Sequence, residues 1–142
     1  ARSAFNRYYY ATFLSARSML ARFDSAWERT PHSNLPDLLE NTLPGRIRSR
    51  ADKAAKNGAI SHSQKMAVIS RAIQSARELA QLLKQALMVR ITADYRPDEY
   101  IVSGSADISL ANCTLASAKG WCKRAEFHVS ILLRLGADVY AI

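Results

Sequence analysis

Five side chains combine types and positions that could bind or transform a phosphate group: Arg7, His32, Arg90, Asp94 and Tyr95. An arginine guanidinium holds a phosphate or a carboxylate through two parallel hydrogen bonds. Histidine transfers protons near neutral pH because its ordinary pKa is about 6.5, whereas tyrosine, at about 10, is a poor base unless its surroundings perturb it strongly. We therefore take the arginines as candidate anion ligands and His32 as a candidate proton-transfer group.

Arg90 and Asp94 continue the apolar stripe of a long predicted helix. Apolar residues recur every three or four positions over 61–91, which predicts a helix there: Met66, Ile69, Ile73, Ala76, Ala80, Leu83 and Leu87. Arg90 lies within about 40° of the centre of this stripe, and Asp94 lies on the centre if the helix continues. A buried arginine is costly unless it is paired or reached by solvent. We expect Arg90 to contact Asp94, a ligand phosphate or a partner subunit; Asp94 has a plain structural role as a salt-bridge partner.

The predicted N-terminal helix, 3–23, is apolar on two sides. Its main stripe holds Phe5, Tyr9, Thr12, Ala16, Met19 or Leu20, and Phe23. Tyr10 and Leu14 point the other way, and Arg7 lies opposite the stripe, facing solvent or a second interface. A helix of this kind is central to a bundle or shared with a second subunit, so we expect a homodimer.

A structural role and a functional role are both open for four aromatic residues: Tyr8, Tyr9, Tyr10 and His32. The tyrosines could stack on bases, but packing in the core is the favoured role. His32 falls in the first loop, between Pro31 and Pro36, where a turn or cap role competes with proton transfer. His32 can serve the end of the third long helix only if this loop folds over it.

Basic residues outnumber acidic ones by 20 to 12, giving a net charge of +8 and a sequence pI of about 9.9. Polyanions are therefore the expected partners. The densest basic stretch is GRIRSRADKAAKNG, with its cations at Arg46, Arg48, Arg50, Lys53 and Lys56. As a helix, this stretch presents either a solvated face or a nucleic-acid contact.

Several classes of protein are excluded by missing motifs. The five glycines are scattered singly and form neither GxxxxGK[ST] nor GxGxxG, so no phosphate-cradling loop is predicted. HExxH, CxxC and paired ExxH are absent, and we expect no metal site and no cofactor. Cys113 and Cys122 would lie about 13 Å apart along one helix, too far for a disulfide, and no apolar run is long enough for a membrane span. We expect a soluble, cytoplasmic protein.

The predicted fold is all-α: a four- to five-helix up-and-down bundle formed by one domain, 1–142. Short helices are expected between Asn34 and Leu43 and over the basic stretch, with Pro44 and Gly45 separating them. A loop over 96–106 is predicted to precede a long final helix that ends at Gly136, with Trp121 and His128 packing on its flank. The chain opens without a methionine inside a helical pattern, as a piece of a longer protein would.

Three segments in order resemble proteins of the HEPN-domain family, over about residues 3 to 100. NRYYYATFLSARSML resembles the opening helix of these proteins, PHSNLPDLL their His-Ser turn, and VRITADYRPDE their Arg…Ala-Asp-Tyr signature. The resemblance implies a helical bundle that dimerises around a cleft. Many such domains are metal-independent RNases of toxin–antitoxin or antiviral systems, often paired with a nucleotidyltransferase; others bind nucleotides or have lost activity.

The sequence departs from the nuclease branch of this family, which carries His four to six residues after the Arg. Here Arg90 is followed by Asp94 and Tyr95, and the next histidine is His128. The leading hypothesis is a toxin or defence effector that acts on RNA or nucleotides, as a metal-independent endoribonuclease, with Arg7, Arg90, Asp94 and Tyr95 in the site and His32 transferring protons. The alternative is a non-catalytic module that binds nucleotide, nucleic acid or a partner nucleotidyltransferase.

Overall fold

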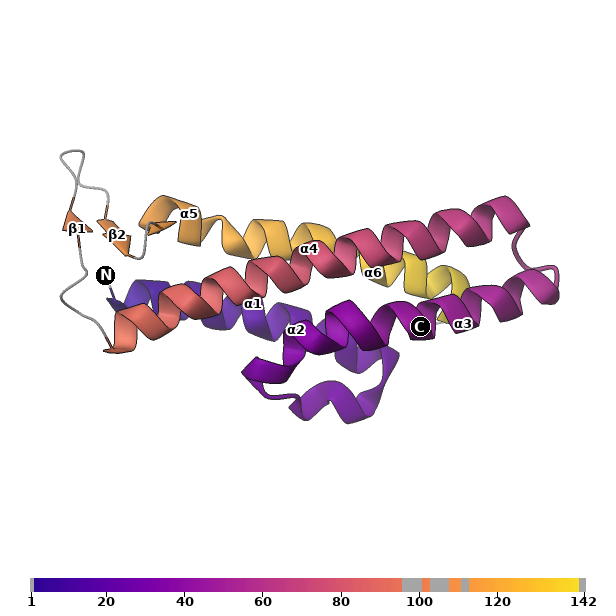
Figure 1. The fold of residues 1–142 in the computed structure, drawn as a ribbon, viewed down its shortest axis with the longest axis horizontal. Coiled ribbons are helices and arrows are strands. Elements are labelled where there is room, and N and C mark those ends of the chain that lie inside the picture. The colour runs from indigo at the N-terminus through magenta and orange to yellow at the C-terminus, as the bar shows by residue number, and fades with distance from the viewer. Residues whose placement is uncertain (1, 96–100, 103–107, 111–112, 141–142) are drawn as a thin grey trace.

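The computed structural model describes residues 2–95, 101–102, 108–110 and 113–140, which form an elongated helical bundle (Figure 1). Four helices run along its length: α1 (Arg2–Phe23), α3 (Leu43–Lys56), α4 (His62–Tyr95) and α6 (Trp121–Tyr140). The helix α4 runs back against the direction of the other three and packs on all of them. The predicted helical bundle is confirmed, but its helices do not alternate up and down throughout, because the short turns between α1 and α3 leave these two helices running in the same direction. Among the described helices, none is long and apolar enough to cross a membrane.

The core follows the predicted apolar stripes, with one exception. In α1, Phe5, Tyr9, Ala16, Leu20 and Phe23 are all buried, because this helix packs against both α4 and α6. In α4, the stripe from Ile69 to Leu87 is buried or half-buried. Met66 was a predicted member of this stripe, but its side chain is 53% exposed, because it lies near the start of α4, before the buried stretch that opens at Val68.

The connection from α1 to α3 folds as short helical turns beside the bundle (Figure 1). These are η1 (Ser25–Arg29), η2 (His32–Asn34), α2 (Leu35–Asp37) and the π-helical η3 (Leu38–Thr42). Asp24 caps η1, since its Oδ1 accepts a hydrogen bond from the Ala26 amide at 2.9 Å. Leu35 and Pro36 are buried, which holds the turn containing His32 against the bundle.

Pro44 and Gly45 do not separate two helices, contrary to the prediction. Helical backbone is continuous from Leu35 to Lys56, with Pro44 in the first turn of α3. A proline lacks an N–H and clashes with the carbonyl four residues before it in a regular α-helix; the preceding π-helical turn relieves both problems. A Cβ built on Gly45 would meet no atom within 4 Å, so neither packing nor a positive φ requires glycine at this position.

The turn between α3 and α4 carries clear local signals. Gly58 adopts a positive φ of 74°, and the amides of Gly58 and Ala59 donate to the carbonyls of Ala55 and Ala54. Ser61 and Gln64 exchange side-chain and backbone hydrogen bonds at 2.7 and 3.0 Å, which is a capping box. These signals explain why the predicted start of α4 is correct.

The predicted final helix is wrong at both of its ends. A small antiparallel sheet is formed by three short strands: β1 (Ile101–Val102), β2 (Ile108–Leu110) and β3 (Cys113–Thr114). The helices α5 (Leu115–Lys119) and α6 follow it. The apolar positions over 108–115 fit a strand period as well as a helical one. Gly136 is buried within α6, which continues to Tyr140. The loop predicted over 96–106 lies mostly outside the described residues, and the strand β1 occupies part of that range.

Candidate functional site

Side chains from three segments meet near the C-terminal end of α4. We call this group the His32–Arg90 cluster and define it as Tyr9, Tyr10 and Phe13 of α1, His32 of η2, and Arg90 of α4. The first loop therefore folds over α1 so that His32 and Arg90 share Tyr9 and Tyr10 as neighbours. This is the arrangement on which a role for His32 beside Arg90 depends.

Three aromatic rings hold the imidazole of His32. Phe13 stacks on it with ring centroids 4.3 Å apart and an interplanar angle of 22°. Tyr9 lies nearly parallel at 5.5 Å, and Tyr10 meets it edge-on at 5.6 Å. The Tyr9 hydroxyl and His32 Nδ1 are 2.6 Å apart, a hydrogen bond that fixes the rotation of the ring. His32 is consequently oriented, with its Nε2 as the remaining ring nitrogen.

The half-buried guanidinium of Arg90 lies over two tyrosine rings. Its Cζ is 4.9 Å from the centroid of Tyr10 and 5.4 Å from that of Tyr9, within the range of cation–π attraction. Arg90 Nη2 also donates a hydrogen bond to the Tyr10 hydroxyl at 3.0 Å. Tyr10 is 40% exposed, so solvent reaches the edge of the cluster. These contacts explain how an arginine is accommodated at the end of an apolar stripe.

The surroundings shift the pKa values of Tyr9 and His32 in ways that divide their roles. Burial raises the pKa of Tyr9 to about 12, against a lowering effect of Arg90, so its hydroxyl stays protonated at neutral pH. Burial, and then the positive charges of Arg90 and Arg17, lower the pKa of His32. The imidazole is therefore neutral at pH 7 and able to accept a proton.

The hydrogen bond between Tyr9 and His32 permits two tautomers of the imidazole. When the tyrosine donates, Nε2 carries the hydrogen. When Nδ1 donates to the tyrosine oxygen, Nε2 has a free lone pair and can act as a base. A ligand hydroxyl that donates its hydrogen to Nε2 requires the second tautomer.

The other predicted site residues lie at the margins of the cluster. Arg7 is exposed on α1, one turn before Tyr10. Asp94 and Tyr95 belong to the last turn of α4, where the structure describes the helix but not these two side chains. Tyr9 is 1% exposed, which confirms that one tyrosine of the triplet is core.

Sequence reasoning missed the contribution of Phe13 and Arg17. Arg17 Cζ lies 4.9 Å from the centroid of the Phe13 ring, on the face of α1 that also carries Tyr9. The signal was available, because residues 9, 13 and 17 recur at the four-residue spacing that places side chains in one row. What the sequence lacked was the position of His32 against this row.

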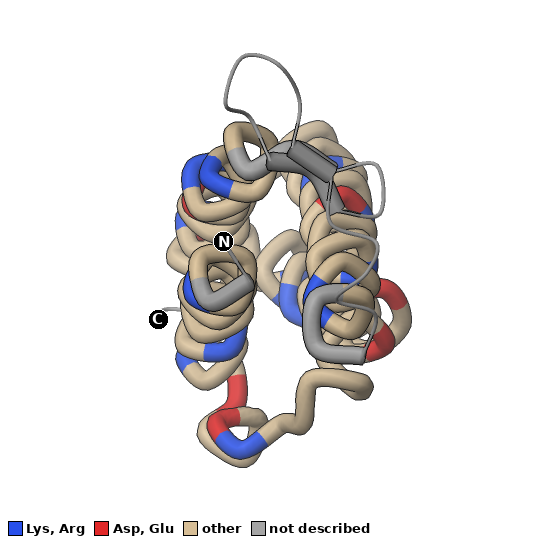
Figure 2. The backbone as a smooth tube through the Cα atoms, turned by 90° about the vertical axis from the view of Figure 1, so that its left-hand side faces the viewer, with Lys and Arg blue, Asp and Glu red and all other residues tan. Residues whose placement is uncertain are grey.

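The basic stretch divides between different faces of α3. Arg46 Nη1 donates to Asp24 Oδ2 at 2.6 Å, and its Cζ lies 4.7 Å from the centroid of the Trp27 ring. Arg46, Arg50 and Lys53 line surface hollows, and Arg48 and Lys56 are exposed. Figure 2 shows that Lys and Arg also occur on other helices, so the excess positive charge is spread over the bundle.

Neutral His32 gives the fold a pH dependence with a definite sign. Its pKa is lowered in the folded state, so as the pH falls below about 6.5 the unfolded chain takes up a proton that the folded chain resists. We expect the free energy of unfolding to decrease between pH 6.5 and the lower pKa of folded His32. Urea denaturation across this range measures the decrease, and NMR titration measures the pKa directly. His128, whose pKa burial also lowers, contributes with the same sign; His32→Gln should remove only part of the decrease. The prediction is contradicted if the free energy of unfolding of His32→Gln falls with decreasing pH as steeply as that of the unmodified chain.

Within the described part of the chain, no group of three or more His, Cys, Asp or Glu side chains is arranged to hold a metal ion. Comparison with protein-family models, curated proteins and solved structures gives no match for this chain. The site must therefore be interpreted from its own chemistry and from the resemblance of its three sequence segments to HEPN domains.

Proposed function

We propose that the chain is a HEPN-like effector of a toxin–antitoxin or antiviral system that cleaves RNA without a metal cofactor, using the His32–Arg90 cluster. The observation that carries the proposal is that His32 and Arg90 contact the same two tyrosines. The nuclease branch of the family supplies its histidine a few residues after the arginine. In this chain, the first loop supplies the histidine from another segment.

The proposed reaction needs a base, an acid and a cation. His32 Nε2 takes the proton of a ribose 2′-hydroxyl, whose oxygen attacks the adjacent phosphorus. The bond from phosphorus to the 5′-oxygen breaks, leaving a 2′,3′-cyclic phosphate and a 5′-hydroxyl. Arg90 stabilises the negative charge on the phosphorane, and Arg7 supplies a second cation. In this proposal the Tyr10 hydroxyl, which accepts a hydrogen bond from Arg90, protonates the leaving oxygen, and Asp94 and Tyr95 follow Arg90 in the last turn of α4.

The same proposal includes a homodimer. Four large apolar side chains are 40–61% exposed on α1 and the C-terminal half of α4, which pack together: Tyr10, Leu14, Met88 and Ile91. We call these four residues the apolar patch. Tyr10 belongs to both the patch and the cluster, so a two-fold contact between two copies of the patch would place two clusters side by side. A second copy of this chain is therefore the proposed occupant.

Introducing a charge into the apolar patch should break the dimer. Leu14→Glu places a carboxylate in the centre of the proposed contact, where burying it without a partner is costly. Light scattering coupled to size-exclusion chromatography is expected to show a dimer for the unmodified chain and a monomer for Leu14→Glu. Met66→Glu is the matched control, because Met66 is 53% exposed but lies near the other end of α4. A monomer in the unmodified chain at micromolar concentration would remove the dimer from the proposal.

The function is tested by incubating the purified chain with RNA in the presence of EDTA. We expect cleavage products that end in a 2′,3′-cyclic phosphate, and growth arrest when the chain is expressed in cells. RNA or nucleotide binding with no cleavage would instead favour the alternative, a non-catalytic module. Capture of a nucleotidyltransferase that suppresses the growth arrest would identify the partner as an antitoxin.

A further inference from the structure

A groove runs along one side of α3, away from the His32–Arg90 cluster. It consists of two hollows that share Arg50 as a wall. The first encloses about 600 Å³ and is lined by Phe23, Arg46, Ser49 and Arg50, among others. The second encloses about 280 Å³ and continues past Lys53 towards the C-terminal part of α6. We call these two adjoining hollows the α3 groove.

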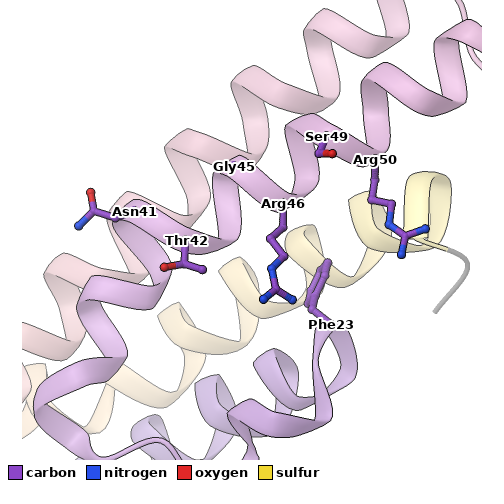
Figure 3. A pocket seen from close by; sticks show the side chains of 7 residues that line it. All are labelled: Phe23, Asn41, Thr42, Gly45, Arg46, Ser49 and Arg50. Carbon is purple, nitrogen blue, oxygen red and sulfur yellow. The ribbon is translucent and has the colours of Figure 1, made fainter.

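Three cations follow one another along this groove. Arg46, Arg50 and Lys53 are separated by four and three residues, so they share one face of α3 and span about 10 Å along its axis. Figure 3 shows Arg46 and Arg50 projecting from the same side of the helix with the Phe23 ring between them. A row of this length exceeds what a single phosphate can contact, and it matches a ligand with several phosphates in line.

The guanidinium of Arg46 is held in place before any ligand binds. Asp24 accepts its hydrogen bond at 2.6 Å, and the Trp27 ring supports its face. The Ala26 amide, and then Arg46, lower the pKa of Asp24 and keep it ionised. Asp138 lines the second hollow together with Lys53. Arg46 thus has a fixed orientation, and Arg50 and Lys53 add two further cations along the groove.

Gly45 lines the first hollow and leaves the backbone of α3 uncovered there. Glycine within a helix is less favourable than alanine, because the unfolded chain has more freedom to lose. At Gly45, a side-chain methyl group would point into open space, and the backbone has no positive φ. The fold does not require this glycine, and its missing side chain leaves the helix backbone open to close approach from the first hollow.

We propose that the α3 groove binds the sugar–phosphate backbone of a single RNA strand. This inference rests on the proposed RNA-directed function, and it assigns RNA binding to a surface separate from the His32–Arg90 cluster. Among the described residues, none of the large apolar side chains that are exposed lines this groove, whereas insertion into a membrane surface uses such side chains.

Charge-matched variants test the groove. Arg50→Gln with Lys53→Gln removes two groove cations, and Arg48→Gln with Lys123→Gln removes two exposed cations of the same types, one on the opposite face of α3 and one in the N-terminal part of α6. Binding of a short fluorescein-labelled oligouridylate is measured by anisotropy at several salt concentrations. We expect the groove pair to lower affinity about tenfold at physiological salt and to reduce the slope of log K against log salt by roughly 0.7 per lost contact. The control pair should change neither. Equal losses in the two pairs would overturn the proposal, and Lys53→Gln alone repeats the test if the groove pair melts early.

The substitution Gly45→Ala is expected to change stability and RNA binding in opposite directions, which distinguishes a loss of binding from a loss of folding. The substitution should raise the melting temperature, because alanine favours the helix and its methyl group meets no atom. It should weaken binding of the same oligouridylate, because the methyl group occupies the hollow. A higher melting temperature with unchanged affinity would count against close approach of RNA to α3.

The groove and the catalytic proposal fail in different ways. RNA binding that depends on Arg50 and Lys53 without any cleavage would support the groove and contradict the proposed nuclease. Cleavage that is unaffected in the groove pair would contradict the groove alone. Binding to phosphatidylserine vesicles that depends on the groove cations, with no binding to RNA, would replace the RNA strand by an anionic membrane and overturn the proposal.

Discussion

Replacing His32 with glutamine is expected to lower the rate of RNA cleavage by roughly 10²–10⁴-fold, the range that general acid–base catalysis contributes. Glutamine retains a polar side chain of similar size but cannot take up the 2′-hydroxyl proton. The rate of product formation under single-turnover conditions measures the effect. RNA affinity should change little, because the groove cations lie elsewhere.

His128→Gln is the matched control for this substitution. His128 is also half-buried, and burial also lowers its pKa. It belongs to α6, however, where its Nε2 lies 3.5 Å from Oε2 of Glu78 on α4. We expect this variant to cleave RNA at the unmodified rate. Cleavage at the unmodified rate by His32→Gln would remove His32 from the site and leave it as an aromatic packing residue.

Arg90→Lys is expected to reduce cleavage by roughly 10²–10³-fold, comparable to the loss of one preorganised donor to a charged transition state. Lysine keeps the charge but loses the planar fork that can lie over the rings of Tyr9 and Tyr10 while donating to a phosphate. A site role predicts this loss with little change in the melting temperature. Tyr95→Phe should also reduce activity if its hydroxyl takes part.

A structural role for Arg90 gives the opposite pattern. The variant would then lose on the order of 1–3 kcal/mol of stability through its broken hydrogen bond. Arg77→Lys, on the exposed side of α4, controls for the change of side chain alone. Early melting of Arg90→Lys together with full activity of Tyr95→Phe would show that the end of α4 is not the site.

The sequence predicted the parts of the fold that local rules control. The stripes of α1 and α4 follow from apolar periodicity, and the start of α4 follows from the pairing of Ser61 with Gln64. The failures occur where two patterns compete. Pro44 signals the end of a helix, but the π-helical turn before it allows the helix to continue. Residues 108–115 satisfy the period of a strand as well as that of a helix.

The candidate site was only partly predictable for a different reason. Arg90 stood out because a cation follows an apolar stripe on the same helix face. His32 could be identified by type but not by position, because its loop gave no sign of where it packs. Its neighbours Tyr9 and Phe13 come from a distant helix, and such tertiary contacts leave no trace in the spacing of one segment.

The capped turn at Gly58 has a consequence for the order in which the chain folds. The helices α3 and α4 are joined by five residues with their own hydrogen bonds, so their hairpin closes at a small cost in chain entropy. The His32–Arg90 cluster requires α1 to meet the far end of α4, a contact between segments some 80 residues apart. During synthesis, the ribosome must release the whole of α4 before this contact can form. The cluster is therefore assembled late, after the hairpin that carries the basic face of α3.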